Sequence, residues 1–165
     1  MQNNFFYSKK EKGFTIIEVI VAIFILAVAI LGSYYAFAQM AGLTTIIASR
    51  LTAAYLAQEG IELVRSVRDT NWLNGLAWNS QISSCSSGCE IDYNLDSVMV
   101  YSDRFLNVDN SNFYSYSVGT PTKFKRRITI TAPAADTLGV SVQIQWQDRG
   151  SPYTFSAEEY LYNWR

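Results

Sequence analysis

Hydrophobic residues are distributed very unevenly along the chain. Residues 19–49 carry no formal charge, and those up to Leu31 are almost entirely Val, Ile, Ala, Leu and Phe. A membrane-spanning helix needs about 20 mostly apolar residues, and residues 14–35 meet that length with Glu18 as their only charge. A domain of this size rarely buries an all-round apolar helix of such length. We therefore expect residues 14–49 to form a membrane-inserted helix.

The pattern becomes amphipathic in residues 50–69. Small and apolar residues recur there at helical spacing and form one stripe, with polar residues opposite. The stripe consists of Ala53, Leu56, Gly60, Leu63, Val64 and Val67, and the polar side of Thr52, Glu59, Glu62, Ser66 and Asp69. No proline precedes Pro121, so a single helix can continue from the membrane segment through this stretch. On it we expect Arg65 to pair with both Glu62 and Asp69.

The C-terminal third alternates between apolar and polar residues, as half-buried strands do. The alternation is clearest in residues 140–147 and also present in residues 124–131. Turn-forming residues at 148–152 separate them from a last strand over about 153–162. Three consecutive strands predict an antiparallel β-meander over residues 123–165, with one face against the amphipathic helix.

The segment between helix and meander, residues 70–122, is rich in Asn, Ser, Asp and Tyr and has few periodic runs. We expect a variable loop region there, with a short strand at 98–101 and a loop at 107–112. The whole pattern predicts an α+β fold, in which a long N-terminal helix packs on a C-terminal antiparallel sheet. Residues 70–165 would form the globular head.

Composition argues against an enzyme. The chain has no histidine, which excludes histidine-based triads, imidazole metal sites and histidine acid–base catalysis. Its two cysteines cannot form a four-thiolate zinc site, and no pair of carboxylates stands out as catalytic. A formal net charge of −1 gives no bulk attraction to nucleic acid. We expect no catalytic residues, no metal and no cofactor.

The charges around the apolar segment predict its orientation. Lys9, Lys10 and Lys12 precede the segment, opposed only by Glu11. Positive residues beside a short leading segment stay in the cytoplasm, so the C-terminal head would be exported. No small-residue cleavage site follows the apolar stretch, unlike in an ordinary secretory signal.

Export bears on the two cysteines, Cys85 and Cys89, which enclose Ser-Ser-Gly. In an oxidising compartment this spacing predicts a short local disulfide, with Gly88 easing the turn. The spacing differs from Cys-x-x-Cys, which argues against a catalytic redox pair. Two reduced thiols are the alternative.

The unusual feature lies in front of the apolar segment, in Gly13-Phe14-Thr15-Ile16-Ile17-Glu18. This junction resembles the prepilin-type signal of type IV pilins and type II secretion pseudopilins. That signal has a short basic leader, a Gly, a Phe or Met, and a Glu at the fifth mature position. The resemblance implies a leader at residues 1–13, removed by a prepilin peptidase between Gly13 and Phe14, and N-methylation of Phe14.

Glu18 is a functional candidate on physical grounds as well. A carboxylate within an apolar membrane helix is costly unless it is paired. One interpretation is that Glu18 snorkels to the nearby interface. The other pairs it with a cation of another subunit, and cleavage after Gly13 would create one in the new α-amino group of Phe14. In pilin-like filaments this contact is thought to set the register between subunits.

The resemblance also implies a localisation and partners. The protein would sit in the cytoplasmic (inner) membrane, in contact with lipid, and then join other pilin or pseudopilin subunits with the help of an inner-membrane assembly platform. The C-terminal sequence is similar to that of minor pilins and I-type pseudopilins; it reads Glu159-Tyr160-Leu161-Tyr162-Asn163-Trp164. Many major pilins have a proline where this chain has Tyr35. We therefore expect a minor subunit.

Two other classes of function stay open. An adhesive or ligand-binding tip subunit would bind through the tyrosine-rich loops between Asn94 and Tyr116, and a plain single-pass anchored protein would never polymerise. A basic cluster at Lys123, Lys125, Arg126 and Arg127 could contact DNA phosphates. A solvated strand face that discourages edge-to-edge pairing is the preferred interpretation of the cluster, and DNA is not an expected partner.

Overall fold

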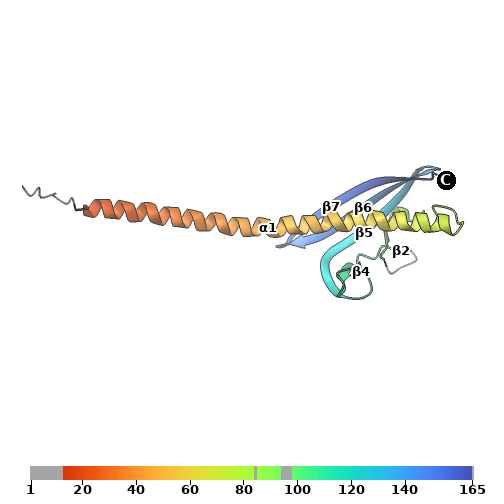
Figure 1. The fold of residues 1–165 in the computed structure, drawn as a ribbon, viewed down its shortest axis with the longest axis horizontal. Helices are drawn as coiled ribbons and strands as arrows, with labels where there is room; N and C mark the ends of the chain where they lie inside the picture. The colour runs from red at the N-terminus through yellow and green to blue at the C-terminus, as the bar shows by residue number, and fades with distance from the viewer. Residues whose placement is uncertain (1–12, 84, 94–97, 165) are drawn as a thin grey trace, which may run out of the picture. The chain divides into compact units, whose positions relative to one another are not determined.

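The computed structural model describes residues 13–83, 85–93 and 98–164. The chain divides into two compact units, Met1–Thr45 and Ile46–Arg165, which we describe separately. A single helix, α1 (Ile16–Leu73), contributes residues to both (Figure 1). The basic flank at Lys9, Lys10 and Lys12, and the rest of the expected leader before Gly13, lie outside the described residues.

In the first unit, α1 continues without interruption through Gly32 and Gly42. Polar side chains in this stretch bond back to the helix: Ser33 Oγ donates to the Ala29 carbonyl at 2.8 Å, and Thr44 Oγ1 to the Met40 carbonyl at 3.1 Å. Hydroxyls satisfied in this way can sit in an apolar environment without a separate partner.

The second unit packs the rest of α1 against one face of a seven-stranded sheet (Figure 1). The elements that follow the helix are η1 (Cys85–Ser87), β1 (Cys89–Glu90), β2 (Met99–Val100), β3 (Phe105–Val108), β4 (Tyr114–Ser115), β5 (Thr120–Ala134), β6 (Thr137–Asp148) and β7 (Ser151–Tyr162). The expected α+β fold, a long helix on an antiparallel sheet, is therefore confirmed.

The meander predicted for the C-terminal third is present. Strand β6 pairs antiparallel with β5 on one side and with β7 on the other. Between β6 and β7, Arg149 and Gly150 have φ of 51° and 79°. Two consecutive positive φ angles are typical of a type I′ turn, the connection that suits two-residue hairpins. A turn is thus present within the expected residues 148–152, but it is shorter than predicted, because Asp148 ends β6 and Ser151 already begins β7.

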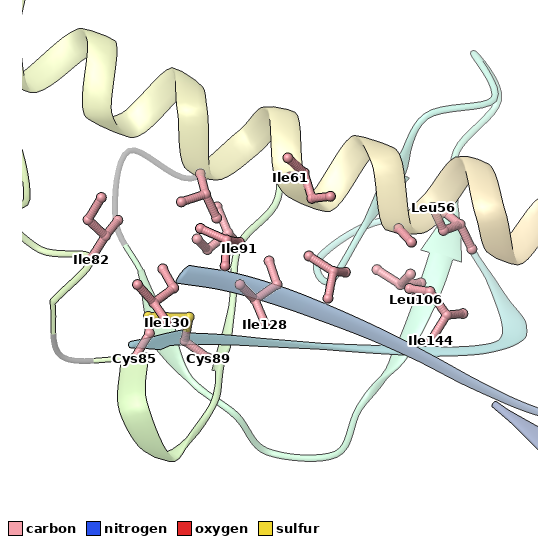
Figure 2. Close-up of a cluster of buried hydrophobic side chains, with 14 of the residues drawn as sticks. Leu56, Ile61, Ile82, Cys85, Cys89, Ile91, Leu106, Ile128, Ile130 and Ile144 are labelled. Carbon is pink, nitrogen blue, oxygen red and sulfur yellow. A yellow bond between two sulfur atoms is a disulfide. The ribbon is translucent and has the colours of Figure 1, made fainter. Parts of the chain in front are cut away.

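The core of the second unit lies between the helix and this sheet. Side chains from α1, β1, β3, β5, β6, β7 and the segment before η1 contribute to it, and Figure 2 shows Leu56 and Ile61 of the helix directed toward Ile128, Ile130 and Ile144 of the sheet. Helix and sheet approach each other closely at Gly60, where an added Cβ would lie 2.8 Å from Val142 Cγ1. The predicted stripe is confirmed, although Leu63 and Val67 are only partly buried, and Ala57 and Ile61 join it.

Three sequence-based expectations were wrong in detail. Asn107 and Val108 belong to β3 and not to a loop, because they pair with β4 and β5. Arg65 does bind Glu62, with Nη1 and Oε1 2.7 Å apart, but its second partner is Glu159 of β7 and not Asp69. Helical spacing alone could not identify a partner supplied by the sheet.

The third correction concerns Arg126, which is not part of a solvated strand face. It lies on the same side of β5 as Phe124 and Ile128, with no exposed surface. Its guanidinium donates to the carbonyls of Leu56 and Ile91 and makes an ion pair with Glu59 at 3.2 Å. Nor is β5 an edge, since β6 pairs along one side of it and β1 and β3 along the other.

Candidate functional site

The site predicted from the sequence lies where α1 begins. Gly13, Phe14 and Thr15 precede the helix and belong to no regular element. All three are exposed, with 82% of Phe14 accessible, and an added Cβ at Gly13 would meet nothing within 4 Å. The peptide bond between Gly13 and Phe14 is therefore sterically open to another protein.

Thr15 caps the helix, a role that the sequence interpretation overlooked. The backbone N–H of Glu18 donates to Thr15 Oγ1 at 3.3 Å, and the N–H of Val19 donates to the Thr15 carbonyl at 3.2 Å. A Thr followed three residues later by Glu, ahead of an apolar run, is the capping-box signal and could have been found. The cap starts the helix one residue after Thr15.

Glu18 occupies the first turn of α1. A carboxylate there interacts favourably with the partial positive charge of the helix N-terminus. Glu18 has no ion-pair partner among the residues that the structure describes. Glu18 thus places a negative charge at the start of an apolar helix, where its carboxylate can pair with a cation from another molecule.

The helix behind this junction exposes its apolar side chains all round. Within α1 lies a window long and apolar enough to cross a membrane, and none of it is buried within the chain. Exposure reaches 68% at Phe24 and 69% at Leu31. Exposed apolar surface of this extent marks contact with a membrane or with other proteins.

The expected disulfide is present in the second unit. Cys85, at the start of η1, is joined to Cys89, at the start of β1, and both are almost fully buried in the core. Gly88 between them has φ of 105°, a conformation that favours glycine. The bridge closes a local turn against the sheet (Figure 2).

The basic cluster on β5 is largely neutralised within the chain. Lys123 Nζ lies 3.0 Å from Asp148 Oδ2, and Lys125 Nζ 2.5 Å from Asp103 Oδ2. Hydrogen bonds from these lysines hold the pKa of Asp148 and of Asp103 below the usual value of a carboxyl. Arg127 donates to the Ser87 carbonyl at 2.8 Å. Three of the four basic groups are thus paired with a carboxylate, Arg126 with Glu59, which leaves mainly the charge of Arg127 for phosphates.

The region proposed for an adhesive tip, between Asn94 and Tyr116, is described from residue 98 onward. Two of its tyrosines serve internal contacts: Tyr101 Oη donates to Asp103, and Tyr116 Oη to the Arg126 carbonyl at 3.0 Å. Burial raises the pKa of Tyr116 to about 12. These hydroxyls thus support the fold of the region.

Comparison with known families agrees with the geometry of the junction. Residues 8–34 match the family model described as the prokaryotic N-terminal methylation motif. No curated protein and no solved structure matches the chain. Among the described residues no group of His, Cys, Asp and Glu side chains could hold a metal ion. The chain carries, in its N-terminal segment, the signature of type IV pilins and pseudopilins.

Proposed function

We propose that this chain is a structural subunit of a type IV pilus or type II secretion pseudopilus, and a minor one. A prepilin peptidase removes residues 1–13 and methylates the new N-terminus at Phe14. Residues 14–49 then hold the subunit in the inner membrane and later in the filament core. Residues 50–69 continue the helix onto the exported head, residues 70–165. The exposure of Gly13 and Phe14 just ahead of the helix supports cleavage at the bond between them.

The observation that carries the proposal is the carboxylate of Glu18, which has no ion-pair partner among the described residues and lies at the start of a helix whose apolar, membrane-length window is exposed. In hydrocarbon such a charge needs an opposite charge beside it. The α-amino group of Phe14, freed by cleavage, is that charge on a neighbouring subunit. At about 4 Å and an effective dielectric near 20, the pair gains about 4 kcal/mol before desolvation.

The same reasoning explains why cleavage would precede assembly. An uncut chain has a peptide bond at Phe14 and no amine to offer, so its neighbour's Glu18 would stay unpaired in the apolar core. Around this pair, exposed apolar side chains such as Ile20 and Leu26 pack against those of other pilin or pseudopilin subunits. The membrane lipid covers them before assembly, and the inner-membrane assembly platform moves the subunit from one environment to the other.

The experiment is a filament assembly assay in cells that contain the prepilin peptidase, with three variants. Glu18→Ala and Glu18→Gln both remove the charge, and Thr15→Val removes only the cap hydrogen bond. We expect the two Glu18 variants to be cleaved and to remain in the membrane fraction. Thr15→Val should be recovered with sheared filaments at close to the wild-type amount, since a cap contributes only about 1 kcal/mol.

The comparison separates pairing from helix capping. Recovery of Glu18→Ala with filaments at the wild-type level would refute the pairing role of the carboxylate. Equal losses in Glu18→Gln and Thr15→Val would show that the defect comes from a frayed helix start.

A further inference from the structure

The sheet has a second face that the helix does not cover. On β6 the even-numbered residues from Leu138 to Trp146 are buried in the core, so the residues between them point to the opposite side. These include Ser141, Gln143 and Gln145, and on β7 the exposed positions include Ser156. We call this side of β5, β6 and β7 the outer face; along β6 and β7 its centre carries uncharged hydroxyl and amide groups. On β5 the residue opposite Gln143 is Arg127, whose guanidinium is engaged by the Ser87 carbonyl and the ring of Tyr101.

A small hollow of about 220 Å³ lies at one end of the outer face. Its floor is Gly139, where an added Cβ would lie 2.9 Å from Thr131 Oγ1 and 3.4 Å from Tyr160 Cε1. Glycine inside a strand often marks a close approach by another group. Here the ring of Tyr160 approaches the bare backbone and keeps 61% of its surface exposed.

Hydrogen-bonding groups surround this aromatic ring. Hydroxyls of Thr129, Thr131 and Ser141 line the hollow together with the carboxylate of Glu158. Ser141 Oγ donates to Glu158 Oε1 at 3.4 Å, a long bond that a ligand hydroxyl could replace. An exposed ring beside such donors and acceptors suits a ligand with one apolar face and a hydroxyl-rich edge.

A larger hollow of about 730 Å³ lies at the other end of the outer face. Its lining includes the half-exposed ring of Phe105, together with Gln145, Gln147 and Thr154. The two lysines beside it are neutralised, Lys123 by Asp148 and Lys125 by Asp103. The lining therefore provides apolar contact and neutral hydrogen-bonding groups, with little free positive charge for an anion.

The two hollows share an axis along the strands. Thr154 in the larger hollow and Tyr160 in the smaller one both belong to β7, and six residues of strand span about 20 Å. We propose that the outer face binds an extended neutral polysaccharide. One sugar ring stacks on Tyr160, in the hollow beside Gly139, and the polysaccharide then runs along β7 to Phe105. A sugar ring has the required apolar C–H face and hydroxyl edge, and a neutral chain meets the lack of free positive charge.

This inference goes beyond the structural function proposed above and does not depend on assembly, because every group involved lies in the second unit. The test uses the full chain in lauryldimethylamine oxide micelles, since detergents with sugar head groups would compete. The ligands are neutral hexasaccharides of glucose, mannose, galactose and N-acetylglucosamine, their disaccharides, and the anionic hexagalacturonate. Binding is measured by calorimetry and by saturation-transfer NMR.

We expect a neutral hexasaccharide to bind at least about tenfold more tightly than its disaccharide, because only the longer ligand reaches both hollows. Tyr160→Ala should weaken binding about fivefold to tenfold, and Gly139→Val should abolish it by filling the floor. Tyr55→Ala is the matched control, since Tyr55 is a helix residue of similar exposure, 63%, outside the outer face.

Several results would overturn the proposal. These are the absence of binding by every neutral hexasaccharide, tighter binding of hexagalacturonate, and an equal effect of Tyr55→Ala and Tyr160→Ala. Near-ultraviolet circular dichroism of each variant shows that its head is folded, so that lost binding reports on the outer face itself.

Discussion

The two units use the same helix in opposite ways. In the first, α1 is predominantly apolar and is exposed all round over residues 16–40. In the second, its apolar residues form one stripe, and Ala53, Leu56 and Val64 are completely or almost completely buried against the sheet. A helix with one apolar stripe can be satisfied by its own chain, whereas a uniformly apolar helix needs a membrane or other subunits. The sequence pattern thus distinguishes the helix segment that packs within its own chain from the segment that needs a membrane or other subunits.

The contact expected to matter most in the second unit is the buried Arg126. Arg126→Ala would leave Glu59 without this partner and remove the guanidinium donor from the carbonyls of Leu56 and Ile91. We expect the free energy of unfolding of the head to fall by about 3 kcal/mol, the lower end for a broken buried pair, because Glu59 is one-third exposed. Urea titration followed by tryptophan fluorescence measures it.

Arg127→Ala is the matched control on the same strand. Arg127 donates a hydrogen bond to the Ser87 carbonyl and lies over the ring of Tyr101, without a carboxylate partner among the described residues. We expect a loss of about 1 kcal/mol. Equal losses in the two variants would contradict the buried role of Arg126.

Two glycines of α1 allow the two units to be compared directly. An added Cβ at Gly60 lies 2.8 Å from Val142 Cγ1, whereas at Gly32 it meets nothing within 4 Å. Gly60→Leu should overpack the core and destabilise the head by about 1–3 kcal/mol. Gly32→Leu should leave the urea midpoint of the head unchanged. A shift of that midpoint by Gly32→Leu would show that the first unit affects the stability of the second.

The disulfide should contribute less than the largest of these effects. Replacing Cys85 and Cys89 by Ala reopens a five-residue loop, for which the chain-entropy model gives about 2 kcal/mol. Thermal unfolding of the double variant measures the loss, and reduction of the wild-type protein should reproduce it. A variant as stable as the oxidised wild type would show that the bridge is dispensable for the head.

The smallest expected effect is on pH dependence. Hydrogen bonds from Lys123 and Ser49 lower the pKa of Asp148 in the folded state. This stabilisation is present above the ordinary carboxyl pKa and is lost as pH falls through the lowered one, so it disappears in acid below about pH 4. In both Asp148→Asn and Lys123→Met, the free energy of unfolding should therefore fall less steeply as the pH is lowered into the acid range. Unchanged acid slopes in both variants would rule out this linkage.

Much of the fold could be predicted because local patterns decide it. The length of α1 follows from uninterrupted helical periodicity, and the meander follows from alternation on β5 and β6 together with the turn at Arg149 and Gly150. What could not be predicted are contacts that depend on tertiary register. Glu159 binds Arg65 only because β7 lies beside the helix.

Arg126 shows the same limit at the level of one residue. Its charge argued for solvent, but its place in the alternation, two residues from both Phe124 and Ile128, argued for the core, and the partner that decides the case is Glu59 on another element. The candidate site differs. Gly13, Phe14 and Glu18 are close in sequence, so an exposed junction at the start of the helix could be predicted from local pattern, whereas the cap by Thr15 was overlooked. The roles of these residues in processing and assembly stay predictions.

The central claim is that the chain is a precursor whose cleavage prepares the N-terminus for assembly. Intact-mass and N-terminal analysis of the protein co-expressed with a prepilin peptidase tests this claim most directly. The account predicts a chain that begins at Phe14 and carries one added methyl group on its amine. A chain that still begins at Met1, with the peptidase active on a control substrate in the same cells, would contradict it.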